Sequence, residues 1–531
     1  MPIPKSPNVC AGCRSRKRKC DGTQPACSAC VKRGDWCTYP GSSHETHSIV
    51  STQDYWPMLN LDVNSQNDQQ YQQLVPAPGS VNFQDITLAA SIDQILPTVP
   101  SLLSSSNLRD LVNIFFGKHY QTIPIIHYTR LWLRLTGVTN ELPRVLLYAL
   151  CAVSTCYHPD AQVQQSQPQW YEAAKTELSQ ALRSPSHPVD TLQAAVLILH
   201  QAVVQTDYSL SWLLLGDAWR KAVANGFTQL DGKSPPISRE LGEPIGDDPI
   251  VREECRRCIW ALYVFDRGLC TIDLDRAIDE SRLRIHLPMA EENFQGAKMS
   301  SPQAQPPNMK NLLDFTQQRT LQGFATIYQY IILAHHLLGR IGDEVFQGDL
   351  NIHTLDKLKY ELIQTRHILP QTATELSAAD PRDRALVIWL DVLLSTCTIL
   401  LYHPPGNPEN KDWNQCLEAA RTFGLQYRAA RRGSTMLLDN IHVVPLLFIC
   451  SRILMIEHAI PSTIPPEDMT EDMDDLIIVF RQFKDTLGKV GQKFYNGFMF
   501  YLQQDKDQSQ MDKAGSVMEL IRPCDHWPFY D

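Results

Sequence analysis

Residues 10–37 read CAGCRSRKRKCDGTQPACSACVKRGDWC and contain six of the chain's 15 cysteines. The segment consists of two Cys-x2-Cys-x6-Cys motifs in tandem, separated by six residues. Short Cys-x2-Cys pairs are typical of structural zinc sites, in which zinc takes four ligands in a tetrahedron. Two zinc ions need eight sulfur positions, which six cysteines fill if two thiolates bridge both metals. The spacing therefore predicts a binuclear zinc cluster with pseudo-twofold symmetry. The predicted ligands are Cys10, Cys13, Cys20, Cys27, Cys30 and Cys37.

Disulfide bonds and an iron–sulfur cluster fit these cysteines less well. The N-terminal residues MPIPKSP lack the apolar stretch of a secretory signal peptide, and disulfides rarely persist inside the cell. Iron–sulfur clusters usually take four cysteines rather than two sets of three. We therefore expect two structural Zn²⁺ ions, whose binding folds a segment too short to have its own apolar core.

Positive charge is concentrated in the same segment. Residues 1–40 carry a net charge of +6, although the whole chain carries −10. Six thiolates and two Zn²⁺ together carry about −2, so most of this positive charge remains available for phosphate contacts. Arginine and lysine also recognise guanine in the major groove, so the segment predicts binding to double-stranded DNA. The candidate DNA-binding residues between Cys13 and Cys20 are Arg14, Arg16, Lys17, Arg18 and Lys19.

The remainder of the chain predicts a linker and one large helical domain. Residues 41–94 are rich in Ser, Gln, Asn and Asp and contain no Lys or Arg, so we expect a disordered acidic linker. No heptad pattern follows the cysteines, which leaves dimerisation uncertain. From residue 95 to 531, apolar residues recur every three or four positions, which predicts an all-α domain. The strongest helical stretches are 143–157, 191–205, 209–230, 253–269, 321–341, 385–402, 413–429 and 443–458.

Three of these stretches indicate which residues the helices bury. Residues 386–402 are the most apolar, but they include Asp391 and fall short of the roughly 20 residues that span a bilayer. We therefore expect residues 386–402 to form a buried core helix and not a membrane-spanning one, and we expect no membrane partner. In 209–230 and in 253–269, apolar residues recur at helical spacing and so form one apolar face on each predicted helix. Its expected members are Trp212, Leu215, Trp219, Val223, Phe227 and Leu230 in the first, and Cys255, Cys258, Ile259, Leu262, Phe265 and Leu269 in the second.

The cysteine segment resembles the DNA-binding module of the fungal binuclear zinc-cluster (Zn(2)-C6 type) transcription factors. The resemblance implies a module of two short helices over residues 1–40, in which Pro25 shapes the loop between the halves. It implies that Lys17, with Arg16 beside it, reads a CGG triplet in the major groove, and that Arg14, Arg18 and Lys19 mainly contact phosphates. It further implies that Cys10 and Cys27 bridge the two zincs, with Cys13 and Cys20 completing one site and Cys30 and Cys37 the other.

Three stretches of the body resemble the middle homology region of the same family, its fungal-specific transcription factor domain. These are residues 115–132, 212–231 and 254–267. The resemblance implies that residues 95–531 form an all-α regulatory domain. The matching residues are Trp212, Gly216, Ala218, Arg220, Ala222, Gly226 and Asp231, followed by Glu254, Arg256, Arg257, Trp260, Asp266 and Arg267.

These features together predict a sequence-specific transcription regulator that acts in the nucleus at RNA polymerase II promoters. We expect the body to bind a metabolite or protein partner, to mask the DNA-binding segment, or to contact the transcription machinery. One alternative is an enzyme in the helical body with an appended zinc module, but no phosphate-loop, GxGxxG, HExxH or GxSxG motif supports it, and no catalytic residue is predicted. Another is an RNA- or protein-binding zinc module, although Trp36 is the only aromatic residue in 10–37. Target genes, activation versus repression and the inducing signal are left open.

Three further motifs have simpler structural interpretations. Cys255 and Cys258 lie on the apolar face of a predicted helix, so we expect thiols in the core. His335 and His336 are adjacent in a helix and point about 100° apart, so they do not share a metal easily. Residues 467–475, EDMTEDMDD, fit either an acidic activation segment or the N-terminus of a helix, and we favour the helix.

Overall fold

The computed structural model describes residues 19–21 and 28 near the N-terminus. In the remainder it describes 105–139, 142–232, 246, 248–268, 276–296, 326–346, 352–368, 381–403, 412–431, 440–460, 466–504 and 506–514. The chain divides into two units, Met1–Leu74 and Val75–Asp531. The predicted linker at 41–94 and most of the cysteine segment lie outside the described residues, and the domain limits at residues 40 and 94 remain predictions.

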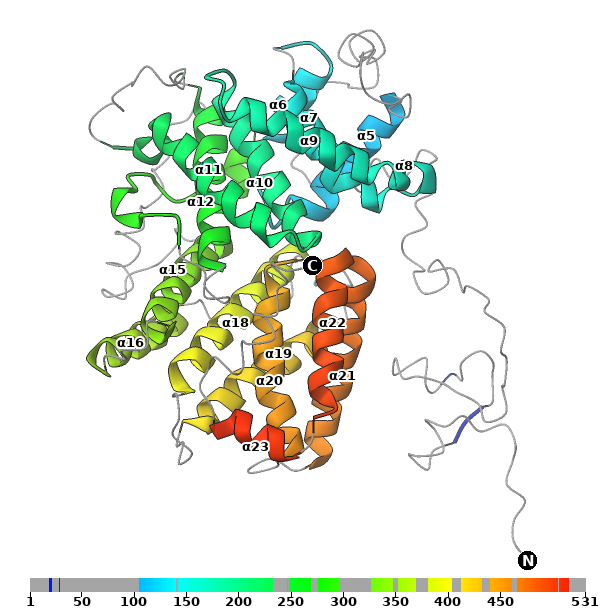
Figure 1. Cartoon of the computed structure of the whole chain (residues 1–531), viewed down its shortest axis with the longest axis vertical. Helices are drawn as coiled ribbons and strands as arrows, with labels where there is room; N and C mark the ends of the chain where they lie inside the picture. The colour runs from blue at the N-terminus through cyan, green and yellow to red at the C-terminus, as the bar shows by residue number, and fades with distance from the viewer. Residues whose placement is uncertain are drawn as a thin grey trace, which may run out of the picture. The chain divides into compact units, whose positions relative to one another are not determined.

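The second unit, called the body below, is helical, and the part of it that the structure describes contains no β-strand (Figure 1). This confirms the predicted all-α class. Its first group of helices lies in residues 105–296. The group comprises α5 (Ser105–Ile114), the π-helix η3 (Phe115–His119), α6 (Tyr128–Leu135), α7 (Arg144–Ser154), the 3-10 turn η4 (Thr155–Tyr157), α8 (Ala161–Gln165), α9 (Gln167–Ala181), α10 (Pro188–Val204), α11 (Tyr208–Ala224), η5 (Phe227–Gln229), α12 (Pro249–Gly268), η7 (Glu280–Arg282) and α13 (Glu291–Gln295).

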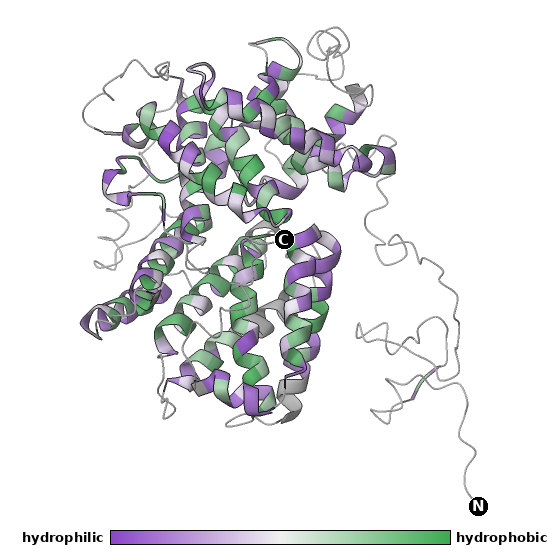
Figure 2. Cartoon of the chain, viewed as in Figure 1, coloured by the Kyte–Doolittle hydropathy of each residue, from purple (hydrophilic) through white to green (hydrophobic). Residues whose placement is uncertain are grey.

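Helix α10 is at the centre of this group. Every residue from Pro188 to Ala202 is buried, and α10 packs against α7, α9, α11 and α12. Its sequence, PVDTLQAAVLILHQAVV, is mainly apolar and its few polar residues are buried as well, as expected for a helix surrounded by others. Figure 2 shows this central helix as mainly hydrophobic, whereas hydrophilic residues are concentrated on peripheral helices such as α8.

The second group of helices follows residue 326. Helices α18 and α20 form its interior: α18 packs against α15, α19 and α20, and α20 also packs against α21 and α22 (Figure 1). The group comprises α15 (Ile327–Phe346), α16 (Ile352–Ile368), α18 (Pro381–Tyr402), α19 (Trp413–Arg431), α20 (Val443–Ala459), α21 (Pro466–Thr486), α22 (Gly488–Leu502) and α23 (Lys506–Ala514).

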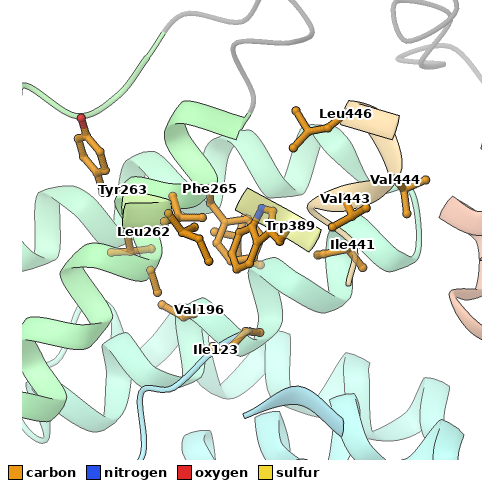
Figure 3. Packing of buried hydrophobic residues seen from close by; sticks show 14 of the residues in the cluster. Ile123, Val196, Leu262, Tyr263, Phe265, Trp389, Ile441, Val443, Val444 and Leu446 are labelled. Carbon is orange, nitrogen blue, oxygen red and sulfur yellow. The ribbon is translucent and has the colours of Figure 1, made fainter. Parts of the chain in front are cut away.

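One apolar core joins the two groups. Side chains from α10, α12, α18 and α20 meet where the groups adjoin, and Trp389 of α18 lies among them (Figure 3). Trp389 stacks on His442 with ring centroids 5.0 Å apart, and Phe265 of α12 contacts the same histidine ring at 4.6 Å. Because both groups contribute to this cluster, we expect them to unfold together.

Most of the helical predictions are confirmed, and one needs correction. Residues 209–230 do not form one helix, because Gly226 adopts a left-handed φ of 72° and α11 ends at Ala224. Glycine takes this conformation without a steric penalty, so it commonly ends helices. The predicted apolar face is also wrong in part: Leu215 and Trp219 are buried, but Trp212 and Val223 are exposed.

The predictions for α12, α18 and α21 are confirmed. In α12, all the expected apolar residues from Cys255 to Phe265 are buried, and Leu269 lies outside the described residues. Within the described chain, Arg384–Tyr402 alone is long and apolar enough to cross a membrane, but 78% of this stretch is buried inside the body. Burial supports the interpretation as a core helix. The acidic stretch 467–475 forms the first turns of α21, where Asp472 is buried and pairs with Arg421 at 3.0 Å.

Candidate DNA-binding site and the buried charge cluster of the body

Two of the predicted site residues lie within the described part of the first unit. Lys19 is exposed to solvent and Cys20 is half-buried, with its thiol outside any disulfide bond. A cysteine outside a disulfide bond can serve as a zinc ligand, since zinc binds the thiolate. The remaining predicted ligands and DNA contacts lie outside the described residues and stay predictions. They are Cys10, Cys13, Cys27, Cys30 and Cys37, and Arg14, Arg16, Lys17 and Arg18.

A hydrogen bond connects the two cysteine motifs. The backbone N–H of Ser28, a helical residue, donates to both carboxylate oxygens of Asp21, at 3.2 Å and 3.1 Å. Asp21 directly follows Cys20, and Ser28 directly follows Cys27. A cluster shared by both motifs requires these segments to lie close together, and this contact joins Asp21 to Ser28. The cysteine pattern does not point to Asp21, although aspartate is a preferred residue for capping a helix N-terminus.

Within the described residues of the body, no three His, Cys, Asp or Glu side chains are placed to hold a metal ion. Cys255 and Cys258 are fully buried, and burial raises the pKa of both thiols well above the usual value. A buried, protonated thiol is a poor zinc ligand. The interpretation as core thiols is therefore confirmed.

The adjacent histidines of α15 have different partners. His335 Nδ1 lies 2.8 Å from the carbonyl oxygen of Ile331, one turn back in the same helix. His336 Nδ1 lies 3.0 Å from Glu280 Oε2 and 3.0 Å from the hydroxyl of Tyr263. Each ring is thus hydrogen-bonded on its own side of the helix, which confirms that the pair is structural.

Two arginines of α12 that resemble the family signature, Arg256 and Arg257, are buried within a charge cluster. Arg256 contacts Glu253 and donates two hydrogen bonds to Asp231, from Nη2 at 2.7 Å and from Nε at 3.0 Å. Burial alone would raise the pKa of Asp231, but the hydrogen bonds and charge of Arg256 lower it below the usual value. Asp231 also accepts from the backbone N–H of His286 at 2.7 Å. We call Asp231, Glu253, Arg256, Arg257 and Glu291 the α12 charge cluster.

Arg257 extends this cluster to segments far away in the sequence. Its guanidinium donates to Glu253 at 3.0 Å and to Glu291 at 2.8 Å. It also donates to the carbonyl oxygens of Pro124 at 3.0 Å and Met289 at 2.8 Å. Arg257 therefore holds the segments before α6 and before α13 against α12.

The rest of the signature has the same structural role. Trp260 Nε1 donates to the carbonyl oxygen of His286 at 2.7 Å. Asp266 contacts Arg267 and accepts from the backbone N–H of Ala277 at 2.7 Å. These contacts fix residues 276–296, which are mainly irregular, along one side of α12. The charged side chains of the signature are thus engaged in holding the body together.

Comparisons with known proteins identify the class. Residues 8–46 match the fungal Zn(2)-Cys(6) binuclear cluster domain, and residues 112–347 match the fungal specific transcription factor domain. The chain therefore belongs to the fungal zinc-cluster transcription factors that carry both domains. Members of this family are transcription factors and not enzymes, so the enzyme alternative is not retained. The match to the cluster domain over residues 8–46 implies that the first unit binds zinc.

Several curated proteins resemble this chain over about half of its length. A citrinin biosynthesis transcriptional activator of Monascus ruber is 23% identical over 339 residues, covering 55% of this chain and 65% of that protein. An azaphilone cluster-specific transcription factor of Aspergillus niger is 26% identical over 319 residues, covering 54% and 63%. An abscisic acid cluster transcription factor of Leptosphaeria maculans is 23% identical over 352 residues, covering 55% and 58%. The chain thus matches about three-fifths of the length of these relatives. No solved structure matches the chain significantly.

Proposed function

We propose that this protein is a sequence-specific regulator of transcription by RNA polymerase II, which binds CGG-containing sites in double-stranded DNA. One observation carries the proposal. The doubled Cys-x2-Cys-x6-Cys motif and five basic residues lie in one short segment, which the family model matches over residues 8–46. The rest of the chain carries a net negative charge, which repels DNA, so the affinity for DNA is restricted to the first unit.

The first unit would hold two Zn²⁺ ions. Cys10 and Cys27 would bridge them, and the other four cysteines would each bind one ion. The metals supply folding free energy to a segment that cannot bury enough apolar surface alone. The hydrogen bond between Ser28 and Asp21 supports this arrangement, because it draws together the residues that follow Cys20 and Cys27.

The basic residues would divide into one group that reads bases and one that contacts phosphates. Lys17 lies four residues after Cys13, about one helical turn, so its ammonium group can be directed from the cluster into the major groove. Arg14, Arg18 and Lys19 would contact phosphates and position the module without selecting a sequence. Arg16 is adjacent to Lys17 and long enough for either role.

The names of the relatives suggest the kind of target. One is described as a citrinin biosynthesis transcriptional activator, and others as azaphilone, tropolone and abscisic acid cluster transcription factors. We therefore propose that this protein controls genes for the biosynthesis of a small molecule. The helical body would regulate the DNA-binding unit, by binding a metabolite or protein effector or by contacting the transcription machinery.

Binding titrations with two variants test the division of roles. Lys17→Ala should cost about 1–3 kcal/mol on a CGG duplex and much less on a random duplex, because a base contact is lost. Arg14→Ala should weaken both duplexes alike and reduce the salt slope by about 1, as expected for one lost phosphate contact. The control is Lys489→Ala, which removes an exposed lysine of α22 and should change neither affinity.

Two results would contradict these roles. Lys17 would be a phosphate contact if its removal weakened both duplexes equally and reduced the salt slope. Arg14 would read a base if its removal weakened the CGG duplex alone. Either result would change the mechanism of sequence choice and leave the zinc cluster unaffected.

A further inference from the structure

One buried lysine of the body differs from the other buried cations. Among the residues that the structure describes, six lysine and arginine side chains are buried. Five of them pair with an aspartate or a glutamate: Arg134, Arg256, Arg257, Arg267 and Arg452. The sixth is Lys221 in the last turn of α11, which is 8% exposed.

Lys221 donates to a neutral group. Its ammonium group contacts the carbonyl oxygen of Ser184, and no carboxylate among the described residues pairs with it. Asp217, one turn earlier in α11, pairs instead with Arg220 at 3.5 Å. Burial lowers the pKa of Lys221, and no neighbouring charge opposes the shift. Burying an ammonium group without a counter-charge is unfavourable, so the surroundings of Lys221 favour an added anion.

The partner of Lys221 belongs to an exposed loop. Ser184 lies between α9 and α10 and is half-buried, whereas Arg183, Pro185, Ser186 and His187 are exposed. The N–H of Ser186 donates within the loop, to the hydroxyl of Ser184 at 3.2 Å. His187 has a left-handed φ of 50°, which is unfavourable for a residue other than glycine. We therefore expect this loop to open locally at low cost.

The sequence of the loop suggests which anion it receives. Residues 183–188 read RSPSHP, and a serine directly before a proline is the minimal site of proline-directed protein kinases. The chain contains four Ser-Pro pairs, and the other three lie outside the described residues. Arg183 adds a second positive charge directly before Ser184. A phosphate on Ser184 would therefore lie near a buried ammonium group and an exposed guanidinium.

We propose that Ser184 is phosphorylated by an ATP-dependent, proline-directed protein kinase and that Lys221 binds the phosphate. Oγ of Ser184 forms a bond to the γ-phosphorus of ATP, and the bond from that phosphorus to the β-phosphate oxygen breaks. ADP leaves, and the hydroxyl proton passes to a base of the kinase. The phosphate carries a charge of about −1.5 to −2 at pH 7 and has three acceptor oxygens. Because Lys221 already contacts the backbone of Ser184, a rotation of the serine side chain brings the phosphate to the ammonium group.

Phosphorylation would fasten the loop between α9 and α10 to α11. A hydrogen bond between an ammonium group and a phosphate is stronger than one to a neutral carbonyl. The N-terminus of α10 also favours a negative charge, and Asp190 in its first turn is already paired with Arg134. Since α10 packs against both α9 and α11 (Figure 1), the modification acts on the central helix of the first group. The proposal does not depend on the bases that the first unit reads.

Mapping of phosphate by mass spectrometry tests the site. The full, zinc-loaded chain is treated with MgATP and a purified cyclin-dependent kinase or mitogen-activated kinase. Phosphate should appear on Ser184, and Ser184→Ala should lack it while keeping any phosphate on the other Ser-Pro pairs, at Ser6, Ser234 and Ser301. A folded chain in which both kinases leave Ser184 unmodified would overturn the proposal.

Hydrogen exchange of residues 183–187 tests the role of Lys221. In the wild type, phosphorylation should slow this exchange about tenfold, because a charge-assisted hydrogen bond stabilises the closed loop. Lys221→Met keeps the apolar stem of the side chain but removes its charge, so phosphorylation of this variant should change the exchange little. The matched control is Arg220→Met, at the preceding position of α11, where the side chain is 78% exposed. Its exchange should slow as in the wild type.

Equal slowing in the wild type and in Lys221→Met would show that Lys221 does not bind the phosphate, and it would overturn the proposal. Before phosphorylation, Lys221→Met should be as stable as the wild type in urea, because the change removes a buried charge that has no counter-charge. If the variant lost helicity by circular dichroism, Lys221→Gln would replace it. That side chain keeps a donor for the carbonyl oxygen of Ser184, and it should abolish the slowing as well.

Discussion

The α12 charge cluster makes a quantitative prediction through Glu253. This carboxylate is fully buried, contacts Arg256, and accepts from Arg257 Nε at 3.0 Å and from the backbone N–H of Met289 at 2.9 Å. Glu253→Gln keeps the shape of the side chain but removes its charge. It also replaces one acceptor oxygen by an NH₂ group that faces a guanidinium donor.

The structure limits how much stability this change removes. Arg256 keeps its two hydrogen bonds to Asp231, and Arg257 keeps Glu291 and two carbonyl oxygens. Removing one partner of a buried ion pair usually costs about 3–5 kcal/mol. Because both arginines retain other acceptors, we expect the lower end, about 3 kcal/mol of unfolding free energy.

Urea unfolding followed by circular dichroism, together with hydrogen exchange of residues 276–296, measures the effect. The matched control is Asp217→Asn, which breaks the exposed pair with Arg220 and should change stability by less than about 0.5 kcal/mol. Exchange in 276–296 should accelerate in Glu253→Gln, since a neutral amide oxygen holds the N–H of Met289 more weakly than the carboxylate does. Equal stabilities of the two variants would refute the claim that the α12 charge cluster holds this segment in place.

Three further predictions concern packing, pH and metal. A Cβ on Gly491 would lie 1.9 Å from the carbonyl oxygen of Phe483, so Gly491→Ala should lower the unfolding free energy of the body by about 1–3 kcal/mol. A Cβ on Gly268 would have no atom within 4 Å, so Gly268→Ala should leave that free energy unchanged in the same urea unfolding experiment. Burial lowers the pKa of His335 to about 4. The neutral ring therefore makes its full contribution to the free energy of unfolding above the unfolded pKa of about 6.5, and this contribution is lost as the pH falls toward 4. The loss from His335 amounts to about 2 kcal/mol at pH 5. His335→Gln should reduce the pH dependence of stability by this amount, while other buried histidines such as His119 and His442 keep theirs. Cys27→Ala should leave less than two zincs per chain by metal analysis while the body stays helical. Two tightly bound zincs would disprove its bridging role.

The sequence predicts those parts of the fold whose signal is local. Continuous apolar runs mark the positions of α7, α10, α18 and α20, because these helices are buried on most sides. Helix α9, at Gln167–Ala181, is not predicted, because it buries only Trp170, Tyr171, Ala174 and Leu178 within an otherwise polar sequence. In α11, Trp212 and Val223 belong to a surface that the body leaves exposed, so hydrophobicity alone assigns them to the wrong face.

The candidate site also has a part that the local sequence predicts and a part that it does not. The cysteine spacing is a local pattern, so zinc and DNA binding can be predicted from it. The role of Arg257 cannot be predicted in this way, because the residues that it holds are up to 133 positions away and include backbone carbonyls. The resemblance to the family points to Arg257, and only the fold shows that it connects separate segments.

The most direct test of the account is the affinity of the full, zinc-loaded chain for two DNA duplexes at physiological salt. One duplex contains CGG triplets and the other has the same base composition in scrambled order. The account predicts binding to the CGG duplex about 10³-fold tighter or more, and loss of this preference when a chelator removes the zinc. Equal affinity for the two duplexes, or a preference that survives zinc removal, would contradict it.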